Sequence, residues 1–229
     1  MFVAADKTRN FYKMEKDAYQ ELLNKNITKD YKKSDDSVID DIAKDDKKIA
    51  DKLEVADRMY RTSKRDSFIT IKDHKQNYIN NTKCRLINPC KSEMGKVIIA
   101  AVKHKSQLQQ WKNTDSVITW FSKLQNKQQL HFIQFDVVDF YGSITPKLLN
   151  DALEHASRYV AISDDTKSTI LQATNSFLYS GSQAWVKKQG GTFDITMGGY
   201  HGAEVCDLVG LFILSKIAEV FPIIGLYQR

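Results

Sequence analysis

The 229-residue chain lacks the features that mark membrane, secreted and disulfide-stapled proteins. It has no apolar run of about eighteen residues, so we expect no transmembrane helix and no membrane partner. Its first residues, MFVAADKTRNFYK, lack the apolar core of a signal peptide. Its three cysteines form no CxxC pair, and the odd count argues against a disulfide framework. We therefore expect an intracellular protein, cytoplasmic or nuclear, with reduced thiols.

Phosphate-binding loops of the common kinds are also missing. Neither GxGxxG nor GxxxxGK[ST] occurs, which argues against a Rossmann or P-loop nucleotide site. The glycine pairs Gly190–Gly191 and Gly198–Gly199 are most simply turns. The hydrophobic content of 42% and charged content of 27% are ordinary for a globular protein.

Charge is distributed unevenly along the chain. Residues 58–127 hold 15 Lys and Arg against 4 Asp and Glu, a net charge of +11, whereas the remaining residues carry −5 and the chain +6. Such a basic block favours a surface that meets phosphates. The alternative is a solvated, lysine-rich face without a partner.

The periodicity of apolar residues predicts a mixture of helices and short strands. Strands 67–71 and 84–87 would form a hairpin with a long loop, and 183–196 a second hairpin turning at Gly190–Gly191. Because no regular βαβ rhythm occurs, the fold class is α+β. Other strands are expected before Asp136 and at the terminal IIGLYQR, and the helices at 14–24, 36–59, 104–126, 147–159, 164–179 and 203–221.

The segment FIQFDVVDFYGSI, residues 132–144, carries the most functional information. Alternation along its strand places Phe135 and Val137 on one face and Asp136 on the other. An ionised carboxylate at the tip of a buried strand is costly unless it is paired, and a divalent cation is one such partner. A helix N-cap is the alternative role for Asp136.

The order of motifs resembles the reverse transcriptases, in particular those of Penelope-like retrotransposons. FDVVDFYGSI resembles their first palm motif, ITIKDHK with CRLINP their fingers hairpin, and FDITMGGYHGAE their glycine turn and following helix. VAADKTRN resembles a segment upstream of the fingers, and IGLYQR lies where the family places its Tyr-x-Asp-Asp strand. The resemblance implies an RNA-directed DNA polymerase with nucleic acid and deoxynucleoside triphosphates as partners.

The resemblance also implies roles for single residues around two Mg²⁺ ions. Asp136 would be the catalytic carboxylate and metal ligand, with the carbonyl of Val137 as a further ligand. Tyr141 would lie under the sugar of the nucleotide, where a ring clashes with a 2′-hydroxyl; plain packing is the alternative. Asp139 is explained as well by the role of a local backbone acceptor as by that of a catalytic group. We expect the strand at Asp136 to pair antiparallel with the terminal strand.

The basic residues of the hairpin would neutralise the triphosphate. Arg85 can form a bidentate fork on phosphate oxygens, and either Lys72 or Lys75 can act as a point charge. The resemblance implies that Gly198 and Gly199 contact the template and primer.

The resemblance divides the chain into a helical N-terminal segment (1–60), fingers (61–130), the first palm motif (131–145), fingers and palm helices (146–190) and an incomplete palm (191–229). Gln228 and Arg229 stand where the family has its variable residue and first aspartate. We therefore expect a reverse-transcriptase fragment that ends before the Asp-Asp pair and is inactive as it stands. The alternative is a non-catalytic nucleic-acid-binding module derived from a polymerase.

Overall fold

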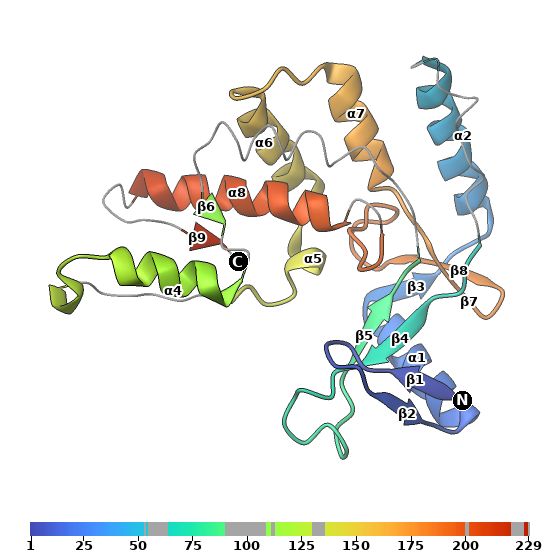
Figure 1. The fold of residues 1–229 in the computed structure, drawn as a ribbon. Coiled ribbons are helices and arrows are strands. Elements are labelled where there is room, and N and C mark those ends of the chain that lie inside the picture. Colours follow the sequence, from blue (N-terminus) through green and yellow to red (C-terminus); the bar gives the residue numbers. More distant parts are fainter. Residues whose placement is uncertain are drawn as a thin grey trace. The chain divides into compact units, whose positions relative to one another are not determined.

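The computed structural model describes residues 1–52, 54, 64–89, 109–110, 113–129, 136–199, 202–220 and 227–228, which mix helices and short strands (Figure 1). The chain forms two compact units. Unit 1 comprises Met1–Glu93 and Ser168–Ala203, and unit 2 comprises Met94–Lys167 and Glu204–Arg229. In the part of the chain that the structure describes, no helix is long and apolar enough to cross a bilayer.

Three small groups of strands form the framework of unit 1. β1 pairs antiparallel with β2, β4 pairs antiparallel with β5, and β8 lies between β3 and β7. Single bridges from Ala5 to Ile71 and from Asp66 to Tyr179 connect these groups. The elements are β1 (Phe2–Ala4), β2 (Phe11–Lys13), α1 (Lys16–Asp30), β3 (Tyr31–Lys33), α2 (Ser37–Lys52), β4 (Phe68–Ile71), β5 (Cys84–Ile87), β7 (Leu178–Ser180) and β8 (Gln183–Lys187).

The apolar core of unit 1 lies between α1 and the strands. Leu23 and Ile27 are one helical turn apart on α1 and are buried together with Ile69 of β4. Full burial of side chains of this size stabilises a fold by about 1.5–3 kcal/mol each. Further members of this cluster are Tyr31 and Leu178, with Tyr19, Leu22, Cys84, Leu86 and Trp185 packed against it.

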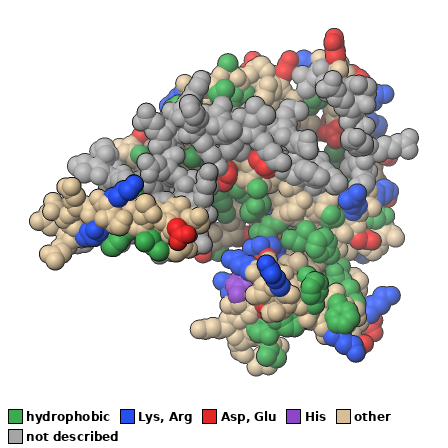
Figure 2. All heavy atoms as spheres, in the orientation of Figure 1, with side chains coloured by type: hydrophobic (Ala, Val, Ile, Leu, Met, Phe, Trp, Pro, Cys, Tyr) green, Lys and Arg blue, Asp and Glu red, His purple; other side chains and the backbone are tan. Residues whose placement is uncertain are grey.

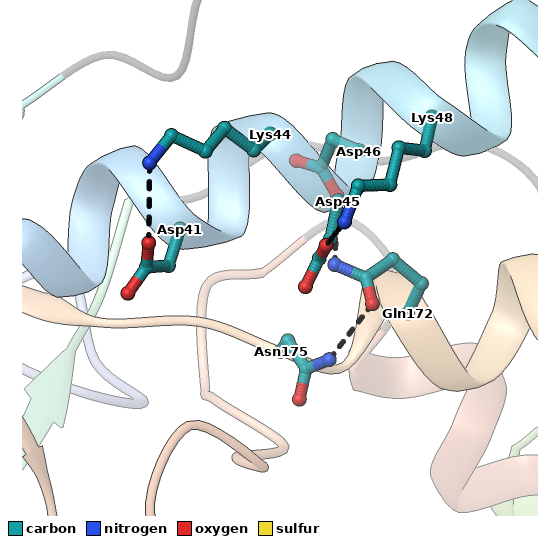
Figure 3. Close-up of polar contacts among 7 residues, drawn as sticks. All are labelled: Asp41, Lys44, Asp45, Asp46, Lys48, Gln172 and Asn175. Carbon is teal, nitrogen blue, oxygen red and sulfur yellow. Dashed lines mark hydrogen bonds and ion pairs between the residues drawn. The ribbon is translucent and has the colours of Figure 1, made fainter.

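Helix α2 has a solvated, charged face and a buried apolar face. Its ion pairs join Lys44 to Asp41 at 3.5 Å and Lys48 to Asp45 at 2.8 Å (Figure 3). Gln172 of α7 (Asp164–Ala173) donates to Asp46 at 3.2 Å. Partial burial raises the pKa of Asp46, although the hydrogen bond from Gln172 opposes that shift.

Helices dominate unit 2. Thr145 starts α6 (Pro146–Ser157) by accepting from the Leu148 N–H at 3.1 Å, and Pro146 stands in the first turn. Helix α6 packs on α8 (Gly202–Val220), where the rings of His155 and Phe212 lie 5.5 Å apart. The remaining elements are β6 (Gln109–Gln110), α4 (Thr114–Lys123), η2 (Lys127–Gln129), α5 (Phe140–Ser143), β9 (Tyr227–Gln228) and the start of α7.

Several expected elements are confirmed and others are wrong. The hairpin of residues 67–71 and 84–87 and the helix beginning at Pro146 are present. The helix expected over 164–179 ends at Ala173, and the chain continues into β7. The hairpin expected over 183–196 is present only as one antiparallel bridge, from Lys187 to Gly191 across the turn at Gly190. The longer hairpin is formed by β7 and β8 and turns at Gly181–Ser182. The helical N-terminal segment also contains β1, β2 and β3, whose three residues each are too short to give a periodic signal.

The terminal strand has a partner that the sequence did not suggest. The described part of this strand, β9, pairs in parallel with β6. The expected pairing with the strand before Asp136 falls largely on residues 131–135 and 221–226, which lie outside the described residues. That pairing therefore stays a prediction.

Protonation of buried His155 should loosen unit 2. Burial lowers the pKa of His155, and the positive charges of Arg158 and Lys216 lower it further. A base with a lowered folded-state pKa contributes stability above its unfolded pKa, near 6.5, which is lost as the pH falls through the folded pKa. Hydrogen exchange of α6 amides, corrected for intrinsic rates, should show weaker protection at pH 5 than at pH 7.5.

Two variants control this measurement. His155→Phe cannot titrate, so it should remove the pH dependence of α6 protection. His74→Gln changes an exposed histidine of unit 1 and should leave that dependence intact. Equal protection of wild-type α6 at both pH values would contradict the prediction.

Candidate nucleic-acid interface

The register of β4 and β5 places basic side chains on one face of the hairpin. Thr70 pairs with Arg85, and the Lys72 N–H donates to the Lys83 carbonyl at 2.8 Å. Because directly opposed residues point to the same face and alternate residues share a face, Lys72, Lys83 and Arg85 lie together. Ile69 and Ile71 occupy the opposite, buried face. Lys72 is therefore the better candidate to bind a phosphate group together with Arg85, whereas Lys75 lies in the turn after β4.

A buried carboxylate orients Arg85. The Arg85 Nη1 atom lies 2.6 Å from Asp6 Oδ1, and the side chains of Arg85 and Asp6 are 32% and 4% exposed. Asp6 is held by its own N–H, which donates to the Ile71 carbonyl at 2.8 Å. A guanidinium carries five N–H donors, so contact with one carboxylate oxygen leaves further donors for phosphate.

A second carboxylate, Asp73, fastens the loop between β1 and β2 to the hairpin. Its Oδ2 atom accepts from Thr8 Oγ1 at 2.5 Å, Asn10 Nδ2 at 3.0 Å and the Tyr12 hydroxyl at 3.0 Å. The hydrogen bond from Thr8 is the main cause that lowers the pKa of Asp73. The contact with Tyr78, then burial, then Asp73 raise the pKa of Tyr12 to about 12. Residues 8–12 are thereby anchored beside the basic hairpin.

The glycine turn meets the end of β5. The Asn88 N–H donates to the Met197 carbonyl at 2.9 Å. Gly198 has φ of +96°, and a Cβ atom there would lie 2.7 Å from Ile87 Cγ2 and 2.8 Å from the Asn88 carbonyl oxygen. Glycine is therefore required at 198 both for its conformation and for the close approach. Gly199 follows it in the same turn and donates its N–H to the Thr196 carbonyl at 3.3 Å.

Asp194 fixes the segment that leads into this turn. It accepts from the Tyr31 hydroxyl at 2.6 Å and pairs with Lys187 Nζ at 3.2 Å. Burial raises the pKa of Asp194, while Lys187 and Tyr31 oppose the shift. The partners come from β3 and β8, so this buried network ties the glycine turn to the sheet.

The segment that resembles a first palm motif lies in unit 2. Asp136 and Val137 are exposed residues of an irregular segment before α5. Asp139 has a left-handed backbone with φ of +52°, and its carbonyl accepts from the Ser143 N–H at 3.0 Å. A Cβ atom at Gly142 would lie 2.9 Å from Asp139 Oδ2, so glycine leaves room for that carboxylate. The Asp139 side chain makes no capping hydrogen bond at the start of α5, so its role as a backbone acceptor or as a catalytic group stays a prediction.

Tyr141 is half-buried on α5 and hydrogen-bonds to Cys206 of α8. Burial, followed by the charge of Asp207, raises the pKa of Cys206 to about 12, and the hydrogen bond from Tyr141 opposes the shift. Contact between α5 and α8 is what the packing interpretation of Tyr141 predicts.

The described residues do not fit a two-metal site. Two Mg²⁺ ions about 3.5–4 Å apart need several carboxylate oxygens around them. Within the described ranges, no three Asp, Glu, His or Cys side chains lie close enough to hold a metal ion. Among the described residues, Asp136 thus has no two further Asp, Glu, His or Cys side chains near it with which it could hold a metal ion.

The predicted site residues divide between the two units. Lys72, Arg85 and Gly198 belong to unit 1, and Asp136 and Tyr141 to unit 2. Sequence reasoning missed Asp6, the buried partner of Arg85. Residues 2–5 before it are all apolar, so no alternation in the sequence marks the face on which Asp6 lies.

Replacing Gly198 with alanine should loosen the contact between the glycine turn and β5. Gly191 is the matched control, because it also has positive φ, +63°, but faces open space. Both alanines carry a left-handed backbone cost of about 1–2 kcal/mol. Gly198→Ala should cost about 1–3 kcal/mol more because of the overlap with Ile87 and Asn88.

Hydrogen exchange of the β4 and β5 amides measures this difference as a local opening free energy. Equal protection in the Gly198→Ala and Gly191→Ala variants would show that the close approach contributes nothing.

No protein-family model, no curated protein and no solved structure matches this chain. Its likeness to the reverse transcriptases accordingly stands on the motifs of its own sequence.

Proposed function

We propose that the chain is the fingers and part of the palm of a reverse-transcriptase-like polymerase, and that unit 1 binds nucleic acid and nucleoside triphosphate through the β4–β5 hairpin. The observation that carries the proposal is the shared face of Lys72, Lys83 and Arg85. Residues 64–89 hold six Lys and Arg against two Asp. The hairpin therefore presents a net positive surface to phosphate.

The surroundings of Arg85 suit the recognition of phosphate. Its ion pair with Asp6 limits the rotation of the side chain, so less entropy is lost when a phosphate oxygen binds. Lys72 supplies a second positive charge on the same face. The turn at Gly198 lies against the end of β5. A nucleic-acid strand bound along this turn would therefore pass close to the hairpin.

A non-catalytic binding module is the second candidate function. The ion pair between Asp6 and Arg85 favours it, because the carboxylate already satisfies part of the charge that a triphosphate would neutralise. Primer extension with Mg²⁺ and deoxynucleotides separates the candidates. Extension above a no-enzyme control supports the polymerase, and binding without extension supports the module.

The proposal predicts salt-dependent binding that weakens when Arg85 is replaced. Fluorescence anisotropy of a labelled RNA–DNA primer–template should give affinities that fall linearly on a log–log plot against salt. Arg85→Gln removes one phosphate contact, so it should reduce the magnitude of the salt slope by about one. Lys72→Gln should act in the same direction.

Lys147→Gln is the matched control. Lys147 is exposed on α6 in unit 2 and pairs with Asp151 at 2.6 Å, so its loss should leave the salt slope unchanged. Affinity that does not vary with salt, or equal slopes for wild type and Arg85→Gln, would refute the proposed interface.

A further inference from the structure

An exposed row of aromatic residues lies on the outer face of unit 1. Phe2 of β1 and Phe11 of β2 are 72% and 69% exposed, and Phe68 of β4 is 42% exposed. Phenylalanine is usually buried, so three exposed rings within one small set of strands need an explanation. In Figure 2, hydrophobic and basic side chains lie side by side on the surface over these strands.

Strand register brings the three rings onto one face. Ala4 pairs with Phe11 and Phe2 with Lys13, so Phe2 and Phe11 are diagonal neighbours, about 7–8 Å apart. The parallel bridge from Ala5 to Ile71 places β1 next to β4. Phe2 and Phe68 each stand three residues before a buried bridge residue, so alternation puts both rings on the exposed face. Burial agrees with this register, because Val3, Ala5, Ile69 and Ile71 are all buried on the opposite face.

The same face carries positive charge. Lys13 lies directly opposite Phe2, and Arg85 is the cross-strand partner of Thr70, two residues after Phe68. Lys7 and Arg9 are exposed in the loop that joins β1 to β2. Aromatic rings separated by basic side chains match a chain that has flat bases and a phosphate at every step.

We infer that the outer face of β1, β2 and β4 is a stacking surface for single-stranded nucleic acid, on which Phe2, Phe11 and Phe68 take unpaired bases and Lys13 and Arg85 take the backbone phosphates. This inference rests on the proposed function, from which it takes nucleic acid as the ligand. It adds a second binding site and base stacking as the mode of recognition. Stacking needs no particular base, so the surface is tolerant of sequence.

Base-bearing and abasic strands distinguish stacking from charge alone. The 229-residue chain is titrated into labelled oligo(dT), oligo(U) and an abasic oligomer of equal length, at one salt concentration. Wild type should bind both base-bearing strands more tightly than the abasic strand. Phe2→Ala and Phe11→Ala should each weaken binding to the base-bearing strands by roughly 5- to 150-fold, with little change for the abasic strand.

Three further variants make the readout specific to the aromatic rings. Phe11→Trp should retain the affinity, whereas Phe11→Leu, which is apolar without a stacking ring, should lose it. Ile118→Ala removes a 60% exposed apolar side chain of α4 in unit 2 and should change nothing. Because Phe2 and Phe11 are exposed, their variants should keep the circular dichroism spectrum of wild type.

The outcomes separate this inference from the proposed function. If Phe2→Ala and Phe11→Ala bind as wild type does while Arg85→Gln weakens binding, the stacking surface is wrong and the phosphate interface stands. If wild type binds neither single strands nor duplex, both are wrong. If wild type is a dimer that Phe11→Ala dissociates, with no loss of base-dependent binding, the face joins two copies of the chain and the inference is overturned.

Discussion

The two-residue alternation of β4 and β5 is the constraint on which unit 1 depends. One set of alternate side chains must face inward: Ile69 joins the core with Leu23 and Ile27 of α1, and Ile71 is buried on the same face of the strand. The other set, including Lys72 and Arg85, has to face outward because a strand offers only two faces. A slip of one residue in this pairing would expose the core residues and bury the cations. The same strand register therefore determines both the stability of the hairpin and the charge of its surface.

The Asp6–Arg85 pair extends this constraint to the start of the chain. A carboxylate that is 4% exposed is costly without a partner, and Arg85 supplies it at 2.6 Å. Together with the contacts of Asp73 to the loop of residues 8–12, the pair holds β1 and β2 beside the hairpin. The basic face of Lys72, Lys83 and Arg85 and the exposed rings of Phe2, Phe11 and Phe68 thus lie on strands that these contacts hold together.

The sequence predicts the elements whose signals are local. The hairpin of β4 and β5 follows from two short β-prone runs, and the start of α6 follows from Pro146. The sequence cannot predict pairings between strands of two or three residues, because such strands carry no period. The pairing of β6 with β9 is of this kind. Asp6 was missed for a related reason, since its role depends on a partner 79 residues away.

Unit 1 is assembled from two stretches of chain, with most of unit 2 lying between them in sequence. Strand β3 ends at Lys33, yet its partner β8 begins only at Gln183. During synthesis from the N-terminus, the β3 edge must therefore remain without β8 until residues 34–187 have been made. Contacts of such long sequence separation slow folding, because loop closure is unfavourable before the pairing stabilises it. The nascent chain consequently exposes a strand edge while these residues are being made, and that edge is where a chaperone would act or where misassembly between chains would begin.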